Sequence, residues 1–135
     1  MRITSQDGTS FIELERRDEG GFLVLAVHAS IAEFTARNRS TIIADASSFL
    51  RDMAAFEARR TGAIALRGDE QDFELRLRAY DRTGHLWVGV SIARRSSSPR
   101  GENVEPLQFS GGFVYNAEYA SQLFADLHAL LRQTA

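Results

Sequence analysis

The sequence predicts an α+β fold: a mainly antiparallel sheet of about seven to eight strands with two helices, one mid-chain and one C-terminal. Three observations lead to this prediction. Several short segments alternate apolar and polar residues, with the period of two that a half-buried strand requires. Turns containing glycine separate many of these segments. Two longer segments instead have apolar residues at the spacing of an amphipathic helix.

We expect a single domain over residues 1–135. The chain has 44% hydrophobic and 25% charged residues, the balance of an ordinary globular domain of this length. It has no cysteine, no signal-peptide core near its start, and no apolar run near the roughly 20 residues of a membrane helix. Its net charge of −2 disfavours nonspecific attraction to nucleic acid. These features predict a cytoplasmic protein that binds neither nucleic acid nor membranes.

The first third of the chain is expected to be rich in strands. One strand is predicted at Phe11–Glu15, where alternation is clear, and another at Phe22–Val27, a continuous apolar run typical of a central strand covered on both faces. The polar segment Arg16–Gly21 between them predicts a hairpin turn. Alternation returns over Ile31–Arg37, so a further strand is expected there, with His28 between the two strands.

The first helix is expected to begin after Asp45, a residue type favoured at the N-cap, and to end at Thr61-Gly62. Its apolar residues share one helical face; they are Ala46, Phe49, Leu50, Met53 and Phe56.

Residues Ala63–Arg95 predict three antiparallel strands joined by two turns, Gly68–Asp72 and Asp81–Gly84. Alternation is regular over Phe73–Tyr80 and continues over Leu86–Ile92, so the register holds across the second turn. The apolar residues of this hairpin therefore form one inward row, which consists of Phe73, Leu75, Leu77, Leu86, Val88, Val90 and Ile92.

The chain is expected to end with a loop, a strand and a helix. Ser96–Pro106 has the composition of a long surface loop. Leu107–Tyr115 predicts the last strand, in which Gly111-Gly112 would permit a bulge or a bend. Asn116 is expected to cap the second helix, whose apolar face comprises Ala120, Leu123, Phe124, Leu127 and Leu131.

The two helical segments also resemble each other. Ser48–Met53 can be aligned with Gln122–Leu127, and each segment follows a run of strands. Because amphipathic helices share a periodicity, we favour shared periodicity over internal duplication as the explanation.

Sequence motifs for catalysis or cofactor binding are absent. His28, His85 and His128 are too far apart in the sequence to form a metal pair on one helix. Neither a G-x-S-x-G elbow nor a glycine-rich phosphate-binding loop occurs. The acidic turn Asp69–Asp72 would hold ordinary carboxylates if it lies in water. We therefore expect no enzyme activity, no cofactor and no metal.

The outward row of the central hairpin is the candidate binding face. Arg76, Arg78, Tyr80, His85 and Trp87 should project to the same side of the sheet. Arginine, tyrosine and tryptophan are enriched at the hot spots of protein interfaces. Alternatively, the C-terminal helix or the rest of the sheet covers Trp87, and the arginines stack on it as part of the fold. Alternation alone leaves both interpretations open.

Segments in the second part of the chain carry a family resemblance. Thr83–Val90 (TGHLWVGV), Leu107–Phe109 and Leu123–Leu127 are similar to small bacterial WapI-type immunity proteins and related uncharacterised domains. The match runs over residues 45–132 and consists mostly of core positions, and it assigns no functional residue. The resemblance implies a non-enzymatic bacterial protein that binds a cognate toxin.

The sequence therefore favours a protein-binding module, and the resemblance suggests an immunity protein with a toxin domain as its partner. The alternative is a small-molecule binding protein with a pocket between the sheet and the C-terminal helix, which predicts a roomy apolar cavity there. An enzyme is the third hypothesis and requires a buried cluster of acids or histidines. Oligomeric state stays open, since a strand edge or the outward hairpin face could pair two chains as a homodimer.

Overall fold

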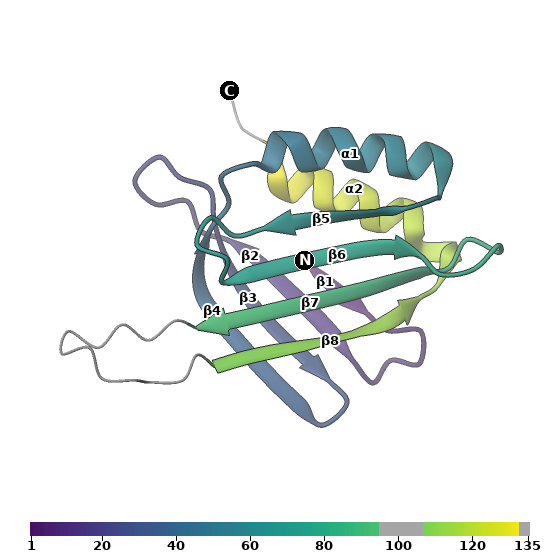
Figure 1. Ribbon diagram of the computed structural model, residues 1–135, viewed down its shortest axis with the longest axis horizontal. Coiled ribbons are helices and arrows are strands. Elements are labelled where there is room, and N and C mark those ends of the chain that lie inside the picture. The colour runs from purple at the N-terminus through teal and green to yellow at the C-terminus, as the bar shows by residue number, and fades with distance from the viewer. Residues whose placement is uncertain (95–106, 133–135) are drawn as a thin grey trace.

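The computed structural model of the protein describes residues 1–94 and 107–132. The described strands form two antiparallel four-stranded sheets (Figure 1). The first sheet contains β1 (Arg2–Thr4), β2 (Phe11–Arg16), β3 (Val24–Ile31) and β4 (Phe34–Ile42). The second contains β5 (Ala63–Arg67), β6 (Phe73–Ala79), β7 (Leu86–Arg94) and β8 (Leu107–Tyr115). Helix α1 (Ala46–Arg59) follows β4, and the 3-10 turn η1 (Ala117–Tyr119) leads from β8 into helix α2 (Ala120–Leu131).

The predicted α+β fold is therefore confirmed, with its strands divided between two sheets. The sheets lie one behind the other with their strands crossing, and both helices lie along one side (Figure 1). The inner faces of the sheets join the helices in one hydrophobic cluster. Each residue of the predicted inward row is at most 5% exposed. Arg95 and the predicted loop Ser96–Pro106 lie outside the described residues.

Both helices bury the apolar faces that the sequence predicts, and Leu50 is the one member left partly buried. Phe56 of α1 meets Phe124 of α2 edge to face, with 6.0 Å between the ring centroids. The side chain of Asn116 accepts a hydrogen bond from the Glu118 N–H, so this predicted cap is confirmed, at the start of η1. Asp45 occupies the N-cap position of α1 without a capping hydrogen bond from its side chain.

The β3–β4 hairpin differs from the prediction. Strand β3 continues to Ile31, so His28 lies inside a strand and not between two strands. The chain reverses at Ala32, whose φ is 55°, a conformation that alanine rarely adopts. Strand β3 is an interior strand of its sheet, as predicted, but it is not covered on both faces, because Ala26 and His28 are only partly buried. It also begins at Val24 and leaves Phe22 exposed in the preceding turn.

Strand β8 does not use its two glycines for a bulge. It pairs with β7 in one continuous register from Leu107 to Tyr115. The glycines instead give room to side chains on both faces of the sheet. A Cβ at Gly111 would lie 3.1 Å from Cδ1 of Ile31, and a Cβ at Gly112 would lie 2.7 Å from the indole of Trp87.

The two halves of the chain repeat one order of elements. Each half is a four-stranded antiparallel meander followed by a helix. The segments Ser48–Met53 and Gln122–Leu127 lie in α1 and α2 respectively. Shared helical periodicity accounts for the likeness of these two segments, but it does not account for the four strands that precede each helix.

A polar contact joins the edge of the first sheet to the second sheet. The buried Thr41 of β4 donates a hydrogen bond from Oγ1 to Oδ1 of Asp72 at 2.6 Å, and Nδ2 of Asn38 donates to Oδ2 at 3.1 Å. Asp72 lies in the β5–β6 turn, where the Asp69 N–H also donates to the Ile42 carbonyl at 2.7 Å. Hydrogen bonds to an ionised group are among the stronger polar interactions, so this contact holds the turn against β4.

We expect Thr41→Val to lower the free energy of unfolding by about 1.5–3 kcal/mol, because it removes a hydrogen bond to a charged group that is partly buried. Thr35→Val, an exposed position on the same strand, is the control and should change that free energy by less than about 0.5 kcal/mol. Urea denaturation of both variants measures the difference. Equal effects would mean that the Thr41–Asp72 contact does not stabilise the junction.

Candidate functional site

The outer face of the second sheet carries an open depression of about 730 Å³. Figure 1 looks onto this face, and both helices lie beside it and not over it. All four strands contribute to the lining. The lining includes Arg67, Glu74, Arg76, Trp87, Gly89, Ser91, Gln108, Ser110 and Gly112.

Small residues form the floor of this depression. Gly89 of β7 is the cross-strand partner of Gly112 of β8, and Ser91 is the partner of Ser110. Trp87 precedes Gly89 by two residues, so its side chain leaves the same face of the sheet. Its indole lies against Gly112, where a Cβ would come within 2.7 Å of the ring, and at ordinary contact distance from Gly89. Gly112 therefore lets the tryptophan lie along the sheet and form one wall.

Four of the five predicted site residues meet on this face. Arg76 and Trp87 line the depression. The guanidinium of Arg78 lies 5.4 Å from the centroid of the Trp87 ring, and Tyr80 stacks on the same ring with 6.4 Å between centroids and 26° between planes. Tyr80 is 52% exposed, while Trp87 is half-buried by these neighbours. In the described structure, α2 does not cover Trp87.

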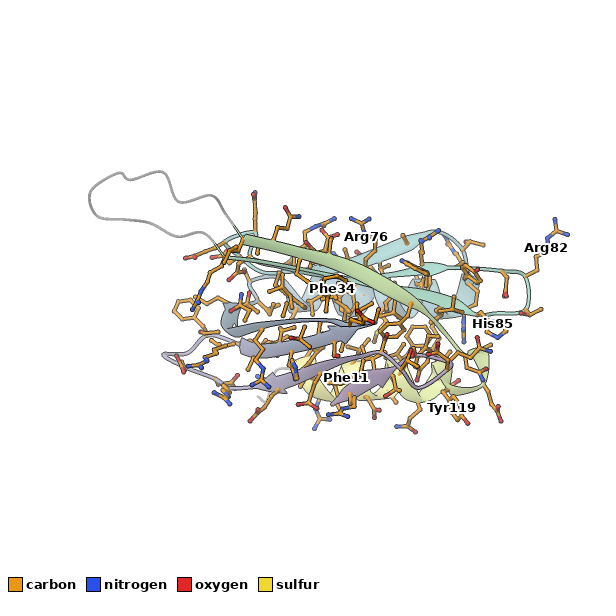
Figure 2. All side chains as sticks on the ribbon, turned by 90° about the horizontal axis from the view of Figure 1, so that it is seen from below. Phe11, Phe34, Arg76, Arg82, His85 and Tyr119 are labelled. Carbon is orange, nitrogen blue, oxygen red and sulfur yellow. The ribbon has the colours of Figure 1, made fainter. Side chains whose placement is uncertain are left out.

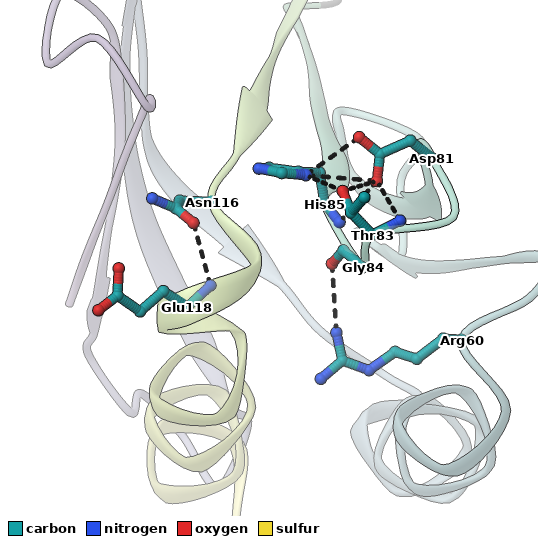
Figure 3. Close-up of polar contacts among 7 residues, drawn as sticks. All are labelled: Arg60, Asp81, Thr83, Gly84, His85, Asn116 and Glu118. Atoms are coloured by element: carbon teal, nitrogen blue, oxygen red, sulfur yellow. Dashed lines mark hydrogen bonds and ion pairs between the residues drawn. The ribbon is translucent and has the colours of Figure 1, made fainter.

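His85, the fifth predicted residue, is held in the turn before β7. Its Nδ1 lies 2.7 Å from Oγ1 of Thr83 and 3.0 Å from Oδ2 of Asp81 (Figure 3). Hydrogen bonds, chiefly from the Thr83 hydroxyl, hold the pKa of Asp81 below its ordinary value. They outweigh partial desolvation, which acts in the opposite direction. Figure 2 shows His85 near Arg82 at the end of the sheet, away from Arg76. The imidazole therefore shapes the turn and does not line the depression.

The depression also includes an ion-pair network that the sequence prediction omitted. Glu74 accepts hydrogen bonds from Nε of Arg67 at 3.0 Å and from Nη2 of Arg76. Burial raises the pKa of Glu74, but the hydrogen bonds from Arg76 and Arg67 outweigh it and hold that pKa below its ordinary value of 4.5. Arg78 lies on the same face of the sheet. The face therefore carries three arginines and one carboxylate in this region, which gives it a positive charge. Alternation along β5 could have identified Arg67, because its side chain leaves the same face of the sheet as that of Ala65, two residues earlier.

Metal binding, membrane insertion and small-molecule binding have less support in the described residues than protein binding has. They include no group of histidine, aspartate and glutamate residues that could hold a metal ion. None of the helices they form has the length and apolar character needed to cross a membrane. The small-molecule hypothesis places its cavity between the sheet and α2. The five apolar residues on the predicted face of α2 are at most 2% exposed and pack into the hydrophobic core there.

Comparison with known proteins does not assign the chain to a family. No protein-family model and no curated protein matches it. Among solved structures, it is similar to a chain of the CdiA-CT/CdiI toxin and immunity complex from Enterobacter cloacae, with 12% sequence identity and a TM-score of 0.41. That likeness covers 87% of this chain and 97% of the other chain.

We expect Gly112→Ala to destabilise the protein by about 1–3 kcal/mol, because the new methyl group would crowd both the Trp87 indole and the Val88 carbonyl. Gly89→Ala, its cross-strand partner, is the control, since a Cβ there has only ordinary contacts. Thermal unfolding together with tryptophan fluorescence measures both effects. If both variants had wild-type stability and fluorescence, the indole would not lie against Gly112.

We expect Glu74→Gln to lower stability at neutral pH by up to about 1 kcal/mol, as for a partly exposed ion pair. The folded state lowers the pKa of Glu74, so its stabilising effect is complete above pH 4.5 and is lost as the pH falls through the lower folded value. Denaturation curves at a series of pH values should therefore converge for wild type and variant in acid. A difference that persists unchanged at low pH would contradict this account of the network.

Proposed function

We propose that the chain is a protein-binding module whose partner docks on the outer face of the β5–β8 sheet. The observation that carries the proposal is the Trp87–Tyr80 stack, which has Arg78 over it and opens onto the depression beside Arg76. Tryptophan, tyrosine and arginine supply most of the binding energy at many protein interfaces. Rigid aromatic rings offer apolar contact area at low entropic cost, and a guanidinium can bind a carboxylate with two hydrogen bonds.

The charge of this face favours a partner segment that carries carboxylates. Arg67 and Arg76 already share Glu74, so part of their charge is compensated within the sheet. Arg78 adds a further positive charge next to the aromatic pair. Complementary charge steers association and raises its rate, so we expect binding to weaken at high salt.

A toxin domain is the partner that the family resemblance suggests. Residues 45–132 resemble WapI-type immunity proteins, and an immunity protein acts by binding its toxin without catalysis of its own. We infer that the chain is such a protein, a single domain that neutralises a cognate toxin in the bacterial cytoplasm. The proposed binding face lies within residues 45–132, the part of the chain that carries the resemblance.

The proposal can be tested with the toxin domain encoded beside this protein. A pull-down should recover the pair, and calorimetry should show that Trp87→Ala, Arg76→Ala and Arg78→Ala each raise the Kd at least about tenfold, as for interface hot spots. Arg37→Ala, an exposed arginine on the first sheet, is the control and should leave the Kd unchanged. Undiminished binding by all three variants would exclude this face.

A further inference from the structure

Strand β8 forms one edge of the second sheet, and some of its backbone groups have no partner among the described residues. The Val114 carbonyl points away from β7, since it accepts a hydrogen bond from the Gln6 N–H at 3.1 Å. Outward-pointing groups recur at every second residue of an antiparallel strand. The N–H and C=O groups of Gln108, Ser110 and Gly112 therefore also point away from β7. Among the described residues, the Val114 carbonyl has a hydrogen-bond partner, whereas the outward backbone groups of Gln108, Ser110 and Gly112 have none.

The other sheet edges have features that block further pairing, and β8 lacks them. Strand β5 lies beside α1, β4 carries Arg37 and Arg39, and β1 is only three residues long (Figure 1). Strand β8 has nine residues, LQFSGGFVY, with no charge, no proline and no break in its register with β7. Natural sheets rarely leave a long, uncharged edge open, because it pairs readily with other strands.

We propose that β8 pairs with β8 of a second copy of this chain, antiparallel and centred on Ser110. In that register Ser110 lies opposite its own counterpart, and Gln108 lies opposite Gly112 of the second copy. Each of these pairs can exchange both backbone hydrogen bonds, because their free groups point outward. On the inner face, Phe109 lies opposite Gly111. Each larger side chain thus meets a glycine, so the strand is complementary to itself and forms a closed two-fold dimer.

Exposed apolar side chains flank the same edge. Leu107 is 73% exposed at the start of β8, and Phe34, at the tip of the β3–β4 hairpin, is 70% exposed. Figure 2 looks toward the β8 edge and shows Phe34 and Arg76 on opposite sides of that strand. An added strand would cover apolar surface on the Phe34 side and would extend the outer face on the Arg76 side. The dimer leaves the outer face open, so the pairing does not depend on the proposed partner.

Sedimentation equilibrium of the full chain, from low micromolar to near-millimolar concentration, tests the pairing. We expect the mass to rise from one chain to two. Ser110→Pro removes an outward N–H without breaking a bond to β7, so it should stay folded by circular dichroism and remain a monomer. Ser110→Thr keeps the N–H and should still dimerise. A wild-type chain that is monomeric throughout, or a Ser110→Pro variant that dimerises like wild type, would overturn the proposal.

A charge exchange tests the register even if the proline variant fails to fold. Because Ser110 opposes itself, Ser110→Glu and Ser110→Arg should each be monomeric through repulsion of like charges. A mixture of the two variants should form a heterodimer, because the opposite charges then face each other. Two variants that dimerise separately, or a mixture that stays monomeric, would contradict a strand pair centred on Ser110.

Discussion

Each sheet of this protein is apolar on one face only. The structure depends on one constraint: these two apolar faces must be buried against each other and against two helices. The alternation in each strand assigns every second residue to that shared core. Leu75 and Val88 are buried for this reason, and Arg76 and Trp87, their neighbours in sequence, are directed outward. The outer face of the second sheet, which the helices do not cover, is thus a direct consequence of how the core forms.

The elements set by local pattern could be predicted from the sequence, and those set by distant contacts could not. Alternation located the β6–β7 hairpin because each strand carries its own signal. The β3–β4 turn was missed because Ala32 has no turn signal; its N–H donates to the buried Oγ of Ser10, a contact between distant parts of the chain. The position of the Trp87 indole likewise depends on Gly112 of another strand. Alternation predicted the side of the sheet from which the His85 side chain projects, but it could not predict the contacts of that side chain with Asp81.

The candidate site combines a rigid floor with exposed anchors. Gly112 leaves room for the Trp87 indole against the sheet, and Tyr80 and Arg78 stack on that indole. Such an arrangement loses little conformational entropy when a partner binds, because the aromatic side chains are already ordered. Strand β8 supplies part of the same depression and also the free edge, so binding of a partner and pairing of two copies would use adjacent surfaces.

The central claim is that Trp87 lies on an open face and not in the core, and it can be tested directly because Trp87 is the sole tryptophan of the chain. Acrylamide quenching of its fluorescence measures the access of a small solute to the indole. We expect native protein to be quenched appreciably, though less than the unfolded chain, since the indole is half-buried. Native fluorescence that acrylamide barely quenches, with a blue-shifted emission maximum, would place Trp87 in a covered site and contradict the account.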